Sequence, residues 1–185
     1  MHRRKRISTT LDIADYFAKI NMSYFIVLHG PLGSGKSTNA ENLAVVLGGH
    51  CISLDKALED NDLDHPEPDA GIPASNFITA LDSVLPTAKH FLENGKIVIF
   101  DGCFYHPDVL EYLIQNLAFP HYIFTLKVPI EICIKRDRAR AKTLGEDTAM
   151  AVHSLVSGND FGVLIDASTS LAETQQAILS HLPLL

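Results

Sequence analysis

The chain has 185 residues, of which 46% are hydrophobic and 20% charged, and its formal net charge is −7. This length suits one α/β domain with a large core and is short for two. No apolar run approaches the roughly 18 to 20 residues that a membrane span requires, and the basic N-terminus leads into a polar segment instead of the apolar core of a signal peptide. Composition therefore predicts a single cytoplasmic domain without a membrane span.

The cysteines and histidines indicate neither disulfides nor zinc. Cys51, Cys103 and Cys133 lie far apart, and no C-x-x-C pair occurs. The nine histidines show no ligand spacing. We expect the three thiols to be reduced and mostly buried, as is usual in a reducing compartment.

The first predicted elements flank a glycine-rich turn. We interpret residues 1–22 as a basic tail with a short amphipathic accessory helix over 8–20, and residues 23–185 as the main domain. Residues 24–29 are mostly β-branched, aromatic or aliphatic, which is typical of a strand buried on both faces. Residues 39–47 place their apolar side chains on one face of a helix.

The stretch HGPLGSGKST between these elements matches G-x-x-x-x-G-K-[ST] at every fixed position, in the strand-to-helix context that the motif requires. Glycines let successive N–H groups approach phosphate oxygens, and the helix start adds unpaired donors and the positive end of its dipole. Lys36 would reach the β- and γ-phosphates, and the Ser37 hydroxyl would ligate Mg²⁺. The alternative is a chance match in a turn that closes a βα unit. The predicted nucleotide-binding residues here are Gly30, Pro31, Leu32, Gly33, Ser34, Gly35, Lys36, Ser37 and Thr38.

A second strand is predicted over residues 51–54, ending at Asp55. Residues 59–73 are acidic and rich in turn formers, so we expect a loop. The D-x-D-x-D pattern within it resembles the start of a calcium loop, but the sixth position is His65 instead of Gly and the twelfth is Gly71 instead of Glu. Calcium is therefore a weak alternative.

Helical and extended patterns alternate through the rest of the chain. Helices are predicted from the apolar spacing at 77–92, at 107–116, from Pro129 and after the capping box Ser170-x-x-Glu173. Strands are predicted at 96–101, 122–128 and 163–166. Alternation with right-handed crossovers predicts an α/β fold with a parallel, five-stranded sheet wrapped by helices.

Residues that follow strands of such a sheet converge on one edge, where ligands bind. Asp101 would hold Mg²⁺ directly or through water, the alternative being a carboxylate that caps a turn. Gly102 follows it where motor-type ATPases usually carry a Glu that polarises water, which favours transfer to a hydroxyl over hydrolysis. Asp55 could accept the proton of an attacking hydroxyl, the alternative being a helix N-cap.

Five basic residues crowd the helix that Pro129 opens. Arg136 and Arg140 are four positions apart and share a face, whereas Arg138 and Lys142 are expected to be solvated. Guanidinium groups on one face suit the oxygens of a transferring phosphoryl group and can exclude water as a lid closes. The turn of this short lid is predicted at residues 143–145.

Together these motifs resemble the small P-loop kinases, which include gluconate and shikimate kinases, chloramphenicol phosphotransferase, zeta-toxin-like kinases and the kinase domain of polynucleotide kinase. The similarity covers about residues 23 to 183. It implies the three-layer α/β/α P-loop nucleoside triphosphate hydrolase fold with strand order 2-3-1-4-5 and a short lid. It also implies that Asp55 is the acceptor-side base, that Arg136 and Arg140 are lid arginines, and that the adenine lies beside Ala167, Ser168 and Thr169.

The resulting prediction is a kinase that uses ATP and Mg²⁺ to phosphorylate a hydroxyl of a small molecule. Its catalytic residues would be Lys36, Asp55, Arg136 and Arg140, with Ser37 and Asp101 at the metal. A nucleic-acid 5′-hydroxyl or a nucleotide is the alternative acceptor, which the acidic 59–69 loop disfavours because long nucleic acids need a basic track. A second alternative is a regulatory ATP-binding module without transfer activity. The acceptor itself, ATP against GTP, and the oligomeric state stay open.

Overall fold

The computed structural model describes residues 23–67, 70–139 and 143–183. Five strands form one sheet: β1 (Phe25–His29), β2 (His50–Ser53), β3 (Val98–Gly102), β4 (His121–Lys127) and β5 (Val163–Asp166). All neighbouring strands pair in parallel, in the order β2-β3-β1-β4-β5. The predicted sheet and its strand order are thereby confirmed. The predicted accessory helix over 8–20 lies outside the described residues.

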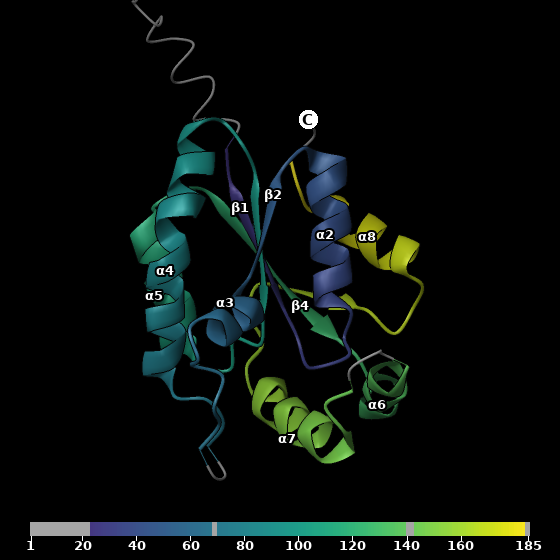
Figure 1. Cartoon of the computed structure of the whole chain (residues 1–185). Helices are drawn as coiled ribbons and strands as arrows, with labels where there is room; N and C mark the ends of the chain where they lie inside the picture. Colours follow the sequence, from purple (N-terminus) through teal and green to yellow (C-terminus); the bar gives the residue numbers. More distant parts are fainter. Residues whose placement is uncertain (1–22, 68–69, 140–142, 184–185) are drawn as a thin grey trace, which may run out of the picture.

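Helices cover both faces of this sheet (Figure 1). On one side lie α4 (Ala74–Glu93) and α5 (Pro107–Leu117), and on the other lie α2 (Lys36–Leu47) and α8 (Leu171–Leu179). The shorter helices α3 (Leu54–Asp60), α6 (Ile130–Arg138) and α7 (Glu146–Ser157) gather around the carboxyl ends of the strands. The arrangement is a three-layer α/β/α fold with its ligand-binding edge at α3, α6 and α7.

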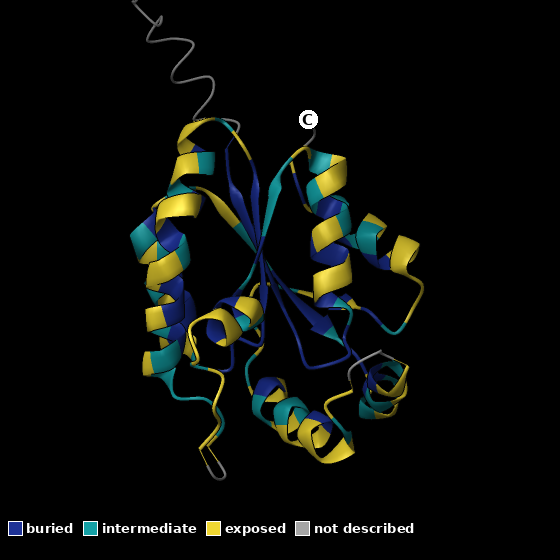
Figure 2. Ribbon diagram, in the orientation of Figure 1, coloured by how far each residue is buried: buried dark blue, intermediate teal, exposed yellow. Residues whose placement is uncertain are grey.

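Strand β1 shows how the sequence produces the two cores. Its five residues are all buried, and successive side chains point to opposite faces. Phe25 and Val27 pack into the core under α4 and α5, whereas Ile26 and Leu28 pack into the core under α2 and α8. Figure 2 shows the resulting pattern, with buried residues in the sheet and on the inner faces of the helices. The central strand is thus held on both faces, which gives the segment that follows it a rigid base.

Several elements differ from the predictions. Strand β2 ends at Ser53, so Asp55 lies in the first turn of α3 instead of ending a strand. Helix α6 ends at Arg138, and residues 140–142 of the helix predicted to Lys142 lie outside the described residues. Helix α7 was not predicted, because its buried positions, Ala149 and Val156, are too few to produce a clear helical pattern.

Among the described residues, no helix combines the length and the apolar character that crossing a bilayer requires.

Candidate active site

The glycine-rich turn, here called the phosphate loop (residues 30–38), leads from the end of β1 into α2. Gly33 has φ +79° and Gly35 has φ +90°, a region that side chains with a Cβ rarely adopt. A Cβ added to Gly33 would lie 2.5 Å from the carbonyl oxygen of Cys133, so α6 packs directly on the loop. The Ser34 hydroxyl is buried and has no hydrogen-bond partner among the described residues. A bare, sharply turned backbone of this kind fits the oxygens of a polyphosphate.

Ser37 and Asp101 meet across the loop and the end of β3. The Ser37 hydroxyl donates to Asp101 Oδ2 over 2.6 Å, and Asp101 is only 1% exposed. Burial raises the pKa of Asp101, although the hydrogen bond from Ser37 and the charge of Lys36 oppose this shift. A hydroxyl and a carboxylate oxygen in contact are the oxygen ligands that Mg²⁺ prefers. The two predicted metal residues therefore lie together.

Lys36 is the buried cation of the site. Its side chain is 5% exposed, and its Nζ lies 3.5 Å from Asp55 Oδ2. Burial lowers the pKa of Lys36, but the neighbouring Cys103, Asp55 and Asp101 outweigh that effect and raise the pKa above its ordinary value. The ammonium group is therefore charged at neutral pH. It can therefore bind an anion without first taking up a proton.

Asp55 projects from the start of α3 toward Lys36. The N-cap of this helix is Ser53, whose Oγ accepts from the Lys56 N–H, so the N-cap role that was the alternative for Asp55 belongs to Ser53. Asp55 Oδ1 instead accepts from the Cys103 N–H over 3.3 Å, and its side chain is 43% exposed. A Cβ added to Gly102 would lie 3.0 Å from Leu54 Cβ, so the glycine allows α3 to approach the end of β3 closely.

Cys103 is a site residue that the sequence patterns missed. Its Sγ lies 3.9 Å from Asp55 Oδ2, and its side chain also interacts with Lys36. Burial, and secondarily the Asp55 charge, raise the pKa of this thiol to about 12, so it is protonated at neutral pH. Its position two residues after Asp101 was the only available signal.

Arg136 bridges the phosphate loop and the segment after β5. Its guanidinium donates to the carbonyls of Gly33 and Ser34 over 3.5 and 3.3 Å, and to that of Thr169 over 3.4 Å. The arginine is thus brought to the predicted nucleotide-binding segments. The other predicted lid arginine, Arg140, lies outside the described residues, as does Lys142.

The turn between α6 and α7 is organised by the buried carboxylate of Asp137. It accepts from the Thr143 hydroxyl and from the N–H groups of Leu144 and Gly145. Arg138 is exposed, as predicted, and forms an ion pair with Glu146 at the start of α7. The predicted turn at 143–145 therefore joins two short helices.

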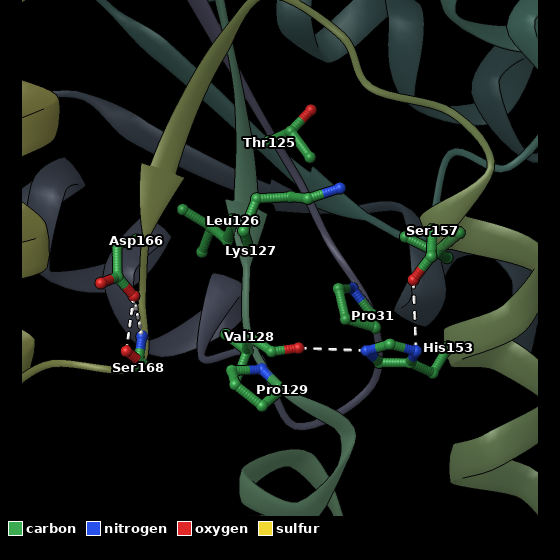
Figure 3. Close-up of a pocket in the computed structure, with 11 residues that line it drawn as sticks. Pro31, Thr125, Leu126, Lys127, Val128, Pro129, His153, Ser157, Asp166 and Ser168 are labelled. Carbon is green, nitrogen blue, oxygen red and sulfur yellow. Dashed lines mark hydrogen bonds between the residues drawn. The ribbon is translucent and has the colours of Figure 1, made fainter.

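A cavity of about 410 Å³ lies between the ends of β4 and β5 and helix α7 (Figure 3). Pro31 of the phosphate loop and Ser168 both line it, together with Lys127 and His153. The His153 ring donates from Nε2 to the Val128 carbonyl and accepts at Nδ1 from Ser157 (Figure 3). Ser168 Oγ donates to Asp166, whereas Ala167 is buried in the core. Of the residues predicted to lie beside the adenine, Ser168 therefore lines this cavity, and the Thr169 carbonyl accepts a hydrogen bond from Arg136.

A protein-family model described as an AAA domain matches residues 25–157. A search of curated protein sequences finds no significant match.

Solved structures resemble this fold over most of their length. A gluconokinase from Sinorhizobium meliloti 1021 has a TM-score of 0.60 and 16% identity, with 86% of this chain and 91% of that chain covered. A sugar kinase from Janibacter sp. HTCC2649 has a TM-score of 0.68 and 16% identity, with 85% and 93% covered. The tunicamycin resistance protein of Deinococcus radiodurans has a TM-score of 0.57 and 22% identity, with 85% and 92% covered. At these identities the similarity establishes the fold, and it confirms the predicted resemblance to the small P-loop kinases.

Proposed function

This chain belongs to the family described as an AAA domain, and we propose that it is an ATP-dependent kinase that phosphorylates a hydroxyl group of a small-molecule acceptor. The observation that carries the proposal is the 3.5 Å separation between Lys36 Nζ and Asp55 Oδ2 at the mouth of the phosphate loop. A cation for the transferred phosphoryl group and a carboxylate for the acceptor proton are thereby side by side. Two of the similar structures, a gluconokinase and a sugar kinase, are named for transfer to hydroxylated small molecules.

The phosphate loop fits the triphosphate of ATP. Its main-chain amides would hold the phosphates, with Lys36 at the β- and γ-groups. Ser37 and Asp101 would hold Mg²⁺, which when bound neutralises charge on the β- and γ-oxygens. The positive φ angles of the two glycines support this assignment, as does the Ser34 hydroxyl, which has no partner in the described part of the chain. Gly102 in place of a water-polarising Glu supports transfer over hydrolysis.

Asp55 is proposed as the base that takes the proton of the acceptor hydroxyl. Its carboxylate is partly exposed, which leaves it accessible to an acceptor, while Lys36 and the Cys103 N–H hold its orientation. The proton moves from the acceptor oxygen to an Asp55 oxygen as that acceptor oxygen attacks the γ-phosphorus and ADP leaves. A base held within hydrogen-bond reach of the acceptor contributes to catalysis through proton transfer in the transition state.

Arg136 is proposed to cover the nucleotide on the side of Ala167, Ser168 and Thr169. Its present contacts with the loop carbonyls and with Thr169 place the guanidinium between those two segments. Arg140 keeps its proposed role as a phosphate-binding lid arginine on the sequence pattern alone.

The charge beside Asp55 favours a small acceptor over a nucleic-acid 5′ end. Residues 54–67 contain six carboxylates, and the lysine among these residues, Lys56, forms an ion pair with Asp60. A polyanionic nucleic acid would be repelled by such a surface, because its binding depends on basic groups that neutralise phosphates. The six carboxylates belong to Asp55, Glu59, Asp60, Asp62, Asp64 and Glu67.

An acceptor screen with γ-labelled ATP tests the proposal. We expect label to appear on at least one sugar, sugar acid, polyol or nucleoside, and not on 5′-hydroxyl oligonucleotides. Transfer to oligonucleotides alone would reverse the choice of acceptor. Normal ATP binding by calorimetry with no transfer in the whole screen would favour the regulatory module, and absence of ATP and GTP binding would overturn the proposal entirely.

Asp101→Asn is expected to impair metal-dependent transfer without lowering the stability of the fold. Since burial raises the pKa of Asp101 in the folded state, its charge opposes folding at neutral pH, and this cost disappears as the pH falls. The neutral variant should therefore unfold in urea at the same or a higher midpoint without nucleotide. Transfer should nevertheless fall by about 10²-fold, with weaker dependence on Mg²⁺ concentration. A variant with wild-type Mg²⁺ dependence would remove Asp101 from the metal site; Asp108→Asn, on α5, is the control.

A further inference from the structure

The segment that enters α4 is held by two side chains from the loop after β3. Ile72 N–H donates to the Tyr105 hydroxyl over 2.6 Å, and the same hydroxyl donates to the Ile72 carbonyl over 3.3 Å. His106 Nε2 donates to that carbonyl over 2.8 Å, since a carbonyl oxygen can only accept. Both main-chain polar groups of Ile72 are thus satisfied. We call Ile72, Tyr105 and His106 the clamp.

The surroundings make the clamp rigid. Tyr105 is 8% exposed, and its ring packs edge-on against Phe77 with centroids 5.2 Å apart. Gly71 has φ +73°, and an added Cβ would lie 2.9 Å from Leu155 Cδ1 and 3.0 Å from the Tyr105 hydroxyl oxygen. The segment therefore passes closely between Tyr105 and Leu155 of α7.

Asn159, which follows α7, connects the clamp to the phosphate loop. Its Nδ2 donates to the Tyr105 carbonyl over 3.0 Å. Its own carbonyl accepts from His29 Nε2 over 3.1 Å, and His29 is the residue immediately before Gly30. His29 is fully buried, and burial lowers its pKa to about 4, so the ring is a neutral donor at neutral pH.

The end of β4 holds Asn159 in place. The Thr125 hydroxyl donates to the Phe161 carbonyl over 2.7 Å, and the Phe161 N–H donates to the Thr125 hydroxyl oxygen over 2.9 Å. Lys127, the last residue of β4, forms an ion pair with Asp160, which lies between Asn159 and Phe161 in the sequence. Asn159 therefore bonds both His29 and Tyr105 from a position next to residues that β4 holds.

The clamp also lies close in sequence to the proposed chemistry. Cys103, whose N–H holds Asp55, precedes Tyr105 by two residues, and Asp101 precedes it by four. Residues 101–106 thus include Asp101, which would hold the metal, the Cys103 N–H that bonds the proposed base, and the two side chains that bond Ile72. Burial raises the pKa of the hydroxyl of Tyr105, which bonds Ile72, and Cys103 and Asp55 lie close enough for their charges to add to this effect. The clamped segment is therefore near the proposed base.

We propose that Tyr105, His106 and Asn159 are positioning residues, which hold segment 70–73 as one wall of the acceptor site and couple it to the phosphate loop through His29. The inference rests on the proposed kinase function. Nucleotide in the phosphate loop tightens the clamp, and a tightened clamp favours acceptor binding by the same factor that nucleotide binding gains.

Amide hydrogen exchange at Ile72 in the full chain tests both parts. In the wild type, a nonhydrolysable ATP analogue with Mg²⁺ should slow this exchange by about tenfold. Tyr105→Phe removes the acceptor of the Ile72 N–H and should speed its exchange by about tenfold without nucleotide. Asn159→Ala should keep the exchange rate without nucleotide and lose the response to the analogue.

Two matched variants control for the loss of a similar group elsewhere. Tyr112→Phe removes a hydroxyl that donates to Asp82 on the surface, and Asn94→Ala removes an amide that donates to His90 at the end of α4. Both should exchange like the wild type at Ile72. Urea midpoints of all variants show whether a change is local or global.

Each result decides one part of the inference. If the Ile72 amide exchanges at the wild-type rate in Tyr105→Phe, the clamp is overturned. The coupling is overturned if the analogue slows Ile72 exchange in Asn159→Ala as much as in the wild type. It is also overturned if a wild type that binds the analogue shows no change in Ile72 exchange. Calorimetry on the same samples distinguishes a failure of the proposed function from a failure of the clamp. A wild type that does not bind the analogue contradicts both the proposed function and the coupling. The comparison of Tyr105→Phe with the wild type without nucleotide still decides the clamp in that case.

Discussion

Lys36→Met is expected to lower the rate of phosphate transfer by about 10³-fold or more. Methionine fills nearly the same volume but brings no charge to the buried position that faces Asp55 and Asp101. A charge in a site this dry acts through a low dielectric, so its loss costs far more than at a surface. The measurement is transfer of labelled phosphate at saturating ATP, together with ATP affinity by calorimetry.

The same variant should also be less stable without nucleotide. Since the pKa of Lys36 is raised in the folded state, its charge stabilises the fold throughout the range below its ordinary value, which includes neutral pH, and the contribution fades only as the pH rises through the raised pKa. Rates must therefore be corrected for the folded fraction. Lys96→Met, an exposed lysine just before β3 at the opposite end of the sheet, is the control. A Lys36→Met enzyme with more than a tenth of wild-type transfer would contradict the proposed role.

Asp55→Asn is expected to lower transfer by about 10² to 10⁴-fold while leaving ATP affinity nearly unchanged. The amide oxygen can still accept from the Cys103 N–H, so the geometry at the start of α3 should persist. An amide cannot take a proton from the acceptor hydroxyl, so the variant lacks the proposed base, and it also lacks the negative charge that faces Lys36. Steady-state rates at several acceptor concentrations should show the loss in kcat instead of KM.

Asp60→Asn provides the matched control on the same helix. Asp60 lies at the end of α3 and pairs with exposed Lys56, so its carboxylate is replaced without touching Lys36. Transfer by this variant should stay within about twofold of the wild type, as expected for an exposed ion pair. If Asp55→Asn retained wild-type transfer, Asp55 would be a structural partner of Lys36, and another group would have to take the proton.

Much of the ligand-binding edge could be predicted because its signals are local. The phosphate loop could be recognised from its spacing of glycines followed by a lysine and a serine. Two of these glycines adopt backbone angles that other residues avoid. The position of Asp101 could be predicted because a carboxylate at the end of a buried strand lies at the sheet edge; its role at a metal stays a prediction. The capping box at Ser170 and Glu173 is present as predicted, since it depends on residues three apart.

Other parts of the site carry no local signal. Helix α7 buries few residues, so its apolar pattern is weak, and the partnership of Cys103 with Asp55 joins positions 48 residues apart. The hydrogen bond between His29 and Asn159 spans 130 residues. Such contacts depend on how β3, α3 and α7 pack, which no window of the sequence contains.

The order of apolar and polar residues by itself determined the strands, the phosphate loop and the sheet they build, because backbone angles and burial periodicity are decided within a few positions. The tertiary structure alone decided which side chains face each other across the edge of that sheet. It brought Asp55 to Lys36 and Asn159 to Tyr105, since side chains from distant elements meet only where packing places them.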